Sequence, residues 1–287
     1  MLTKYHICLL LQIILADICP GQMWRPDHIV IVIEENHTYT QIAGSKAAPY
    51  INSLLQDSTT AIFTQSYALT HPSQPNYLMF FSGSDQGVKD DNFPAVNPFN
   101  TPNLGALLIK AGFTFTGYSE DLPSAGYNGI RSSYYARKHN PWVNWQGSIN
   151  YPIPPVSNQP MTAFPRDYNT LPTVSIVVPN LNNDMHNGTD PATITAADTW
   201  LKNHLDGYIQ WSKTHNSLFI LTYDEDNSAS GNRILTFFDG AMVKKGKYAQ
   251  KNSHYNFLRM LEDMYSLPYS GASAKVKPID YCWRKGK

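Results

Sequence analysis

The chain has 287 residues, 42% of them hydrophobic and 15% charged, which is the balance of a globular protein rather than a disordered one. Its formal net charge is zero and it has no long cluster of Lys and Arg, so its sequence lacks the basic footprint of a nucleic-acid-binding protein. Cys8 and Cys19 lie in or near an N-terminal apolar segment, which leaves Cys282 for a mature chain. One cysteine builds neither a disulfide framework nor a thiolate zinc site, so any metal must be held by oxygen and imidazole ligands.

The first 22 residues have the order of features found in an export signal. Lys4 precedes an apolar run over residues 7–16, and Pro20 and Gly21 end it. About ten apolar residues are too few to span a bilayer but suit the apolar core of a signal peptide. We therefore predict a signal peptide over residues 1–22, a secreted or periplasmic protein, and no membrane span after the signal is removed. A short first helix of a cytosolic protein is the alternative.

Strands and helices alternate along residues 23–287, which we expect to form a single domain. Residues 29–33 and 174–178 are continuous apolar runs, the pattern of strands buried on both faces of a parallel sheet. The alternation implies a mainly parallel sheet with helices on both faces. In chain order we predict a strand at 29–33, helices at 49–56, 75–81 and 102–111, strands at 113–118 and 174–178, a helix at 196–212, strands at 218–223 and 233–238, and a helix at 254–265.

Residues 120–170 break this pattern. They are rich in Pro, Asn, Tyr and Trp and have no sustained period. A stretch of this length without regular structure is usually functional or disordered, and its aromatic content argues against disorder. We therefore predict an irregular lobe, inserted over one end of the sheet on the substrate side. Its aromatic side chains could form a substrate wall or, as we prefer, the core of the lobe: Tyr134, Tyr135, Trp142 and Trp145.

Three clusters of acidic and amide side chains each follow a predicted strand closely. They lie at residues 34–36, 180–186 and 224–226. In open α/β sheets, ligands bind outside the carboxyl ends of the strands, so these clusters are expected to converge. Oxygen-rich side chains on rigid strand ends are the ligands that a divalent cation needs. The alternative is that these Asp and Asn residues only form turns.

Ser73 lies just before a helix that we expect to begin at Pro75. This position places its hydroxyl at the positive end of the helix, where free backbone N–H groups can hold a phosphoryl group and the helix dipole favours an alkoxide. The alternative is that Ser73 is a helix N-cap, which is a common role for Ser.

The chain resembles the bacterial phosphoesterase family that contains acid phosphatases and phospholipases C, within the alkaline phosphatase superfamily. The matching segments occur in the family's order and cover roughly residues 27–268. They are IEENHTY (33–39), PSQPNY (72–77), YSEDLP (118–123), RKHNP (137–141), PNLNNDMH (179–186), YDED (223–226) and SHY (253–255).

The resemblance implies a three-layer α/β/α sandwich and a nucleophilic Ser beside a metal. Ser73 falls at the position of the nucleophile, which would also contact the metal. Glu35 and Asn36 match the first pair of metal ligands, and Asp224 and Glu225 match a later acidic pair, although the larger acid phosphatases often have Asp where Glu225 stands. Oxygen ligands allow Ca²⁺ or Mg²⁺, and participation of His would favour Zn²⁺. The Asp- and His-rich set for two zinc ions that is familiar in nucleotide pyrophosphatases is not evident.

Further residues in the matching segments are candidates for holding the phosphate. His139, His186 and His254 could each bind phosphate, protonate the leaving group or ligate the metal, and the alternative is a neutral buried His that holds a loop. Asn76 is a candidate donor to a phosphate oxygen or a helix-turn residue. Asp184 is expected to orient the His186 side chain without itself contacting the metal or the phosphate.

These inferences together predict a metal-dependent hydrolase of small phosphate esters. We expect an acid-phosphatase-like phosphomonoesterase in which Ser73, activated by the metal, forms a phosphoseryl intermediate that water then hydrolyses. A phosphodiesterase of the phospholipase C type is the first alternative. A catalytically silent extracellular glycan-binding protein that uses the aromatic lobe is the alternative from another class.

Overall fold

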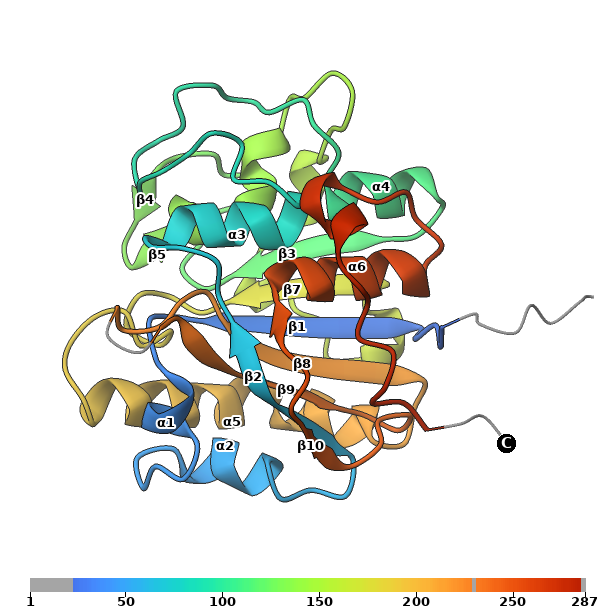
Figure 1. Ribbon diagram of the computed structural model, residues 1–287. Helices are drawn as coiled ribbons and strands as arrows, with labels where there is room; N and C mark the ends of the chain where they lie inside the picture. The colour runs from blue at the N-terminus through green and yellow to red at the C-terminus, as the bar shows by residue number, and fades with distance from the viewer. Residues whose placement is uncertain (1–22, 229–230, 285–287) are drawn as a thin grey trace, which may run out of the picture.

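A computed structural model describes residues 23–228 and 231–284. The predicted signal segment, with Cys8 and Cys19, lies outside the described residues. Within the described residues, nine strands form one sheet in the order β10-β2-β9-β8-β1-β7-β3-β6, with β11 paired to β2 (Figure 1). The strands are β1 (His28–Glu34), β2 (Thr60–Tyr67), β3 (Phe115–Ser119), β6 (Asn158–Pro160), β7 (Val174–Val178), β8 (Ser217–Tyr223), β9 (Arg233–Asp239), β10 (Gly246–Tyr248) and β11 (Asn252–Ser253).

The sheet is mainly parallel. β1 pairs in parallel with β7 and β8, and β3 pairs in parallel with β7 and β6. β9 runs antiparallel to both of its neighbours, β8 and β2. The carboxyl ends of β1, β3, β7 and β8 therefore meet at one edge, as the alternating strands and helices predict.

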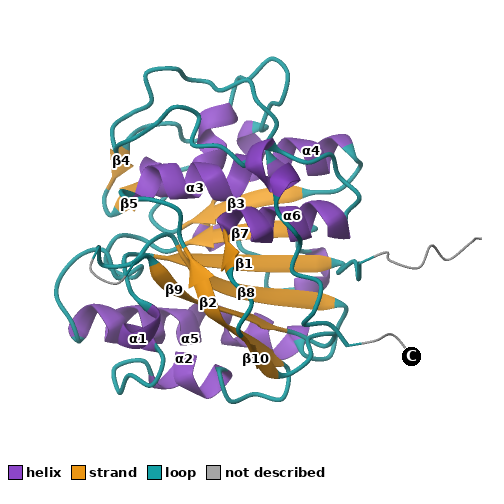
Figure 2. Cartoon of the chain, in the orientation of Figure 1, coloured by secondary structure: helices purple, strands orange, loops and turns teal. Residues whose placement is uncertain are grey.

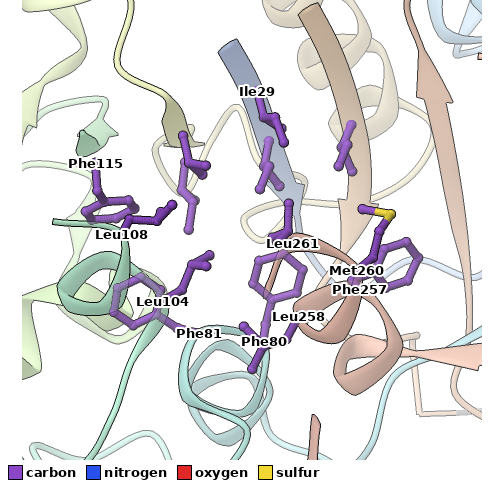
Figure 3. Packing of buried hydrophobic residues seen from close by; sticks show 14 of the residues in the cluster. Ile29, Phe80, Phe81, Leu104, Leu108, Phe115, Phe257, Leu258, Met260 and Leu261 are labelled. Carbon is purple, nitrogen blue, oxygen red and sulfur yellow. The ribbon is translucent and has the colours of Figure 1, made fainter. Parts of the chain in front are cut away.

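Helices cover both faces of this sheet (Figure 2). Successive side chains of a strand point to opposite faces, so β1 contributes to two cores. Ile29, Ile31 and Ile33 pack with α3, α4 and α6, as Figure 3 shows for Ile29, whereas Val30 and Val32 pack with α2 and α5. The predicted three-layer α/β/α sandwich is confirmed. The helices are α1 (Tyr39–Ile42), α2 (Pro49–Leu54), α3 (Ser73–Ser82), α4 (Leu104–Lys110), α5 (Ala192–Ser212) and α6 (His254–Met264).

The element boundaries differ from the predictions in places with clear physical reasons. β2 is not among the predicted strands, because polar Thr64 and Gln65 interrupt its apolar run and its register shifts between Phe63 and Ser66. The helix predicted at 196–212 begins earlier, at Ala192; its first turns contain the β-branched residues Thr193, Ile194 and Thr195, which lower helix propensity. The short strands β6, β10 and β11 carry too few residues to show a period.

The stretch over residues 120–170 contains a two-stranded sheet, one short strand of the main sheet and several 3-10 helices. Trp142 and Trp145 are fully buried, Tyr135 is buried and Tyr134 is exposed. Trp142 packs so closely on β3 that a Cβ at Gly117 would lie 2.0 Å from its ring, which explains the glycine. The short elements are β4 (Arg131–Ser132), β5 (Tyr135–Ala136), η1 (Arg137–His139), η2 (Pro141–Trp145), η3 (Pro155–Ser157), η4 (Met161–Ala163) and η5 (Tyr168–Thr170), and a further 3-10 helix, η6 (Gly271–Lys275), follows α6.

None of the helices within the described residues is long and apolar enough to cross a membrane. Cys282 is buried with a free thiol.

Candidate active site

Backbone N–H groups after β1 donate hydrogen bonds to residues that follow β7 and β8. Glu35 N–H donates to the carbonyl of Asp184 at 2.8 Å, and Asn36 N–H donates to Asp224 Oδ1 at 3.1 Å. Asn36 has a φ of 51°, in the left-handed region that Asn tolerates better than most residues. The sharp turn after β1 therefore brings the first predicted ligand pair beside the acidic pair that follows β8.

Ser73 is the first residue of α3 and its side chain is buried. The N-cap position is held by Pro72, so the alternative reading of Ser73 as an N-cap is wrong. Its hydroxyl lies 3.0 Å from Glu35 Oε2, 3.3 Å from Glu225 Oε1 and 3.5 Å from Asn36 Oδ1. The structure thus gathers three side-chain oxygens, from the ends of two strands, around one hydroxyl at the start of a helix.

The carboxylates of this cluster repel one another in a buried setting. Burial, and then the charge of Glu225, raises the pKa of Asp224 to about 8, and burial raises the pKa of Glu225 to about 7. Burial and then Asp224 raise the pKa of Glu35 well above its usual range. Asp224 Oδ2 is buried without a hydrogen-bond partner among the described residues. Such a set of oxygens is chemically suited to a divalent cation, which would offset the repulsion and occupy the orphaned oxygen.

His139 is fully buried on the other side of Glu35. Its Nε2 lies 3.2 Å from Glu35 Oε1 and its Nδ1 lies 3.3 Å from Asp184 Oδ2. Tyr77 stacks on the His139 ring and donates a hydrogen bond to Glu35 Oε1 at 2.5 Å. Burial, followed by the charge of Lys138, lowers the pKa of His139 well below its usual range, which favours a neutral imidazole.

Asp184 and His186 interact differently from the predicted arrangement. Asp184 Oδ1 accepts the backbone N–H of His186 at 2.9 Å, while its other oxygen faces the ring of His139. The His186 ring is partly exposed and lies beside His139, with the ring centroids 5.6 Å apart. Glu35, His139 and His186 form a group that could hold a metal, since their candidate ligand atoms all lie within 4.8 Å of one another. Glu35 is therefore shared between this group and the oxygen cluster around Ser73.

Asn76 and His254 lie behind the acidic pair. Asn76 Oδ1 accepts the backbone N–H groups of Leu69 and Thr70, and its Nδ2 lies 3.3 Å from Glu225 Oε2. His254 Nε2 donates to the carbonyl of Tyr223 at 3.0 Å, and burial lowers the pKa of His254 to about 4. These contacts hold the loop before Ser73 and the end of β8, just before Asp224.

The model of the family described as "Phosphoesterase family" matches residues 45–268, which is most of the chain. The chain belongs to the phosphoesterase family. Glu35 and Asn36 precede the matched range, whereas Ser73, Asp224 and Glu225 lie inside it. The predicted resemblance is confirmed, and family membership makes the chain a phosphoric ester hydrolase.

Named relatives agree with this assignment. The chain is 45% identical over 258 residues to a phosphatidylinositol-3-phosphatase of Mycobacterium tuberculosis, covering 89% of this chain and 82% of that protein. It is 30% identical to a phosphate-repressible acid phosphatase of Penicillium chrysogenum over 73% of this chain, but spans only 53% of that longer protein. A solved structure of an alkaline phosphatase superfamily protein from Vibrio parahaemolyticus superimposes with a TM-score of 0.57 at 13% identity, over 85% of this chain and 67% of that one, which supports the fold.

Several residues around the site of this phosphoesterase were missed by the sequence analysis. His71 lies with Nδ1 2.8 Å from Glu225 Oε2 and Nε2 3.3 Å from Asp226 Oδ1. Lys138 contacts Asp91 and His186. The only signal in the sequence is proximity, because His71 stands two residues before Ser73 and Lys138 stands directly before His139. Their partners are distant along the chain and only the fold brings them together.

A hollow of about 350 Å³ opens onto the site. Asn36, Glu225 and His186 line it, and His37 and Asp190 form part of its outer wall. His37 Nε2 lies 2.9 Å from Asp190 Oδ1, and this pair braces the turn that carries Asn36. The phosphoesterase therefore has a polar hollow bordered by Asn36 and Glu225, whose side-chain oxygens lie within 3.5 Å of Ser73 Oγ.

Proposed function

We propose that this phosphoesterase is a metal-dependent phosphomonoesterase that acts through a phosphoseryl intermediate on Ser73. The observation that carries the proposal is the position of Ser73 Oγ, which lies within 3.5 Å of side-chain oxygens of Glu35, Asn36 and Glu225. A buried hydroxyl in such a cluster has no evident structural task, because the N-cap of α3 is Pro72.

A divalent cation fits the oxygen set of Glu35, Asn36, Ser73, Asp224 and Glu225. Bound there, it would supply charge that favours the Ser73 alkoxide and the developing charge on the phosphoryl group. Ser73 Oγ attacks phosphorus, the ester P–O bond breaks and the alcohol leaves. Water then cleaves the phosphoseryl bond and releases phosphate. The chemistry of the donors allows Ca²⁺ or Mg²⁺ at the oxygen cluster, and Zn²⁺ if His139 or His186 takes part.

The substrate is proposed to be a small phosphate monoester. The hollow at the site is small and polar, and the related proteins named above are phosphatases. The glycan-binding alternative loses support, because Tyr135, Trp142 and Trp145 are buried and only Tyr134 of these four aromatic residues is exposed. We also propose that the protein works outside the cytoplasm, because residues 1–22 have the order of features found in an export signal.

The direct test compares wild type with Ser73→Ala on p-nitrophenyl phosphate and bis-p-nitrophenyl phosphate. Removing the nucleophile is expected to lower kcat by at least about 10³-fold, with metal binding and the circular dichroism spectrum retained. A rapidly quenched wild-type reaction should contain phosphoserine at Ser73, measurable by peptide mass spectrometry. Ser82→Ala, at the far end of the same helix, is the matched control and should keep wild-type turnover.

Two outcomes would overturn the proposal. The nucleophile assignment fails if Ser73→Ala keeps full monoesterase activity. The monoesterase assignment fails if wild type clearly prefers the diester.

A further inference from the structure

Lys138 is a cation beside the site, with most of its side chain shielded from solvent, that the proposed mechanism does not yet use. It belongs to η1, directly before His139, and its side chain is only 12% exposed. Its Nζ lies 2.6 Å from Asp91 Oδ2 and 3.3 Å from His186 Nε2. An ammonium group held this far from solvent is costly unless fixed partners or a ligand compensate it.

Asp91 connects this ammonium to the start of α3. Asp91 Oδ1 accepts the backbone N–H of Gln74 at 3.0 Å, and Gln74 is the residue after Ser73. The Gln74 side chain in turn donates to the carbonyls of Asp90 at 2.9 Å and Asn92 at 2.7 Å, which holds the loop in place. One carboxylate thus bridges an amide of the first turn of α3 and the Lys138 ammonium, so Lys138 is held beside the nucleophile's helix start.

Lys138 also lies beside two nitrogen groups of the site. Its Nζ faces His186 Nε2 at 3.3 Å, and His139 is the next residue of η1. His139 Nε2 lies 3.2 Å from Glu35 Oε1, and Glu35 Oε2 lies 3.0 Å from Ser73 Oγ. The ammonium therefore borders the same group of side chains that surrounds Ser73 Oγ.

We propose that Lys138 binds a terminal oxygen of the phosphoryl group and selects monoester dianions over diester monoanions, with Asp91 as its positioning residue. A monoester presents three terminal oxygens and up to two negative charges, whereas a diester presents two such oxygens and one charge. A charge-assisted hydrogen bond from an ammonium group is stronger to the more highly charged ligand. This inference rests on the proposed function, because it assigns the substrate class of the same site.

The position of Lys138 also bears on the number of metal ions. His186 Nε2, a candidate ligand of the group with Glu35 and His139, faces the ammonium at 3.3 Å. A cation bound at that nitrogen would sit against the ammonium charge. We therefore expect one metal ion per chain, with Lys138 supplying the second positive charge of the site.

The test uses Lys138→Met in the full metal-loaded protein with the mono- and bis-p-nitrophenyl esters. The loss of one charge-assisted hydrogen bond is expected to lower kcat/KM for the monoester by about 30-fold or more, and for the diester by less than about threefold. The inhibition constant of inorganic phosphate should rise in parallel with the monoester effect. Lys138→Arg should retain part of the monoester kcat/KM and part of the affinity for phosphate that Lys138→Met loses. Lys89→Met, a matched change at a side chain that is 78% exposed, should behave as wild type.

The positioning role of Asp91 is tested with Asp91→Asn. This change keeps an oxygen for the Gln74 N–H but removes the charge that holds Lys138. We expect a several-fold rise in KM for the monoester, kcat within about twofold, and no further loss when the change is added to Lys138→Met. Additive losses in the double variant would show that Asp91 acts independently of Lys138.

Three results would overturn the inference. They are equal losses for the two esters in Lys138→Met, an unchanged inhibition constant for phosphate, and two metal ions per chain by elemental analysis of wild type. Failure of the proposed function looks different, since it would leave Ser73→Ala active or wild type without monoesterase activity.

Discussion

Acidic side chains are buried both at the carboxyl edge of the sheet and on helix α6, but the hydrogen bonding of their carboxylates differs between the two regions. At the edge, carboxylate oxygens of Glu35 and Glu225 lie 3.0 and 3.3 Å from Ser73 Oγ, and Asp224 Oδ2 has no hydrogen-bond partner among the described residues. On α6, Glu262 is fully buried, but Oε1 accepts the backbone N–H of Ser270 at 2.7 Å and Oε2 accepts the Ser273 hydroxyl at 2.5 Å.

The electrostatics of the two regions differ in the same way. Burial raises the pKa of Glu262 to about 7, but the groups around it, first the Ser273 hydroxyl, lower that pKa. Burial raises the pKa of Asp224 to about 8, and its next largest influence is another carboxylate, Glu225. Glu262 is therefore compensated by donors of its own chain and anchors η6 to α6. The cluster around Ser73 also receives donors, such as the Asn36 N–H on Asp224 Oδ1, but it leaves Asp224 Oδ2 without a partner among the described residues, and the proposed cation would occupy that oxygen.

The largest expected effect is on catalysis, when one carboxylate of the cluster around Ser73 is neutralised. Asp224→Asn keeps an oxygen for the Asn36 N–H but removes the charge of a proposed metal ligand. We expect kcat/KM for p-nitrophenyl phosphate to fall by about 10³-fold, equivalent to several kcal/mol of charge stabilisation. The metal-free variant should be at least as stable in urea as the metal-free wild type, because one repulsion is gone.

Glu262→Gln is the matched control for that change, since it also neutralises a buried acid and keeps the shape. It should retain wild-type turnover. The proposed difference between the two regions is contradicted if Glu262→Gln impairs catalysis as strongly as Asp224→Asn does. It is also contradicted if Asp224→Asn clearly destabilises the metal-free protein.

The second effect is the stability gained from the metal. Treatment with a chelator should lower the free energy of unfolding by about 2.7 kcal/mol relative to protein at a metal concentration of 100 Kd, since only the folded state assembles the ligands. The loss is measured by urea denaturation and should be reversed by adding back the metal. Asp224→Asn should show little of this response. An equal chelator response in wild type and Asp224→Asn would place the ion elsewhere.

The smallest expected effect is on the pH dependence of the free energy of unfolding, through Glu262. The folded-state pKa of Glu262 is about 7, above its ordinary value of 4.5, so between these pH values the folded state binds more protons than the unfolded state. The free energy of unfolding should therefore fall as pH rises through this window. Glu262→Gln should match wild type near pH 5 and be more stable by about 2 kcal/mol near pH 8. Urea denaturation of the two metal-loaded proteins at both pH values measures this, and a constant difference between them would contradict it.

The sequence by itself determined the main features of the fold. Runs such as residues 174–178 are too apolar to lie anywhere but inside a sheet, and they locate β1, β7 and β8 to within a residue. Parallel strands align their carboxyl ends, so the polar residues after them had to share an edge. This reasoning, with the resemblance to the family, brought Glu35, Asn36, Asp224 and Glu225 into one predicted site with Ser73. In the structure, side-chain oxygens of Glu35, Asn36 and Glu225 lie within 3.5 Å of the Ser73 hydroxyl, and Asp224 contacts the Asn36 N–H.

Only the tertiary structure decided which side chains meet across long distances in the chain. Asp91 and Lys138 are 47 residues apart, and Asp184 meets the ring of His139 rather than that of its near neighbour His186. β2 likewise became a strand through its pairing with β9, not through its own broken apolar pattern. Local patterns record which face of an element is buried, whereas a contact between loops depends on how separate elements pack. The contacts of Lys138 with Asp91 and of His139 with Glu35 therefore became visible only in the folded molecule.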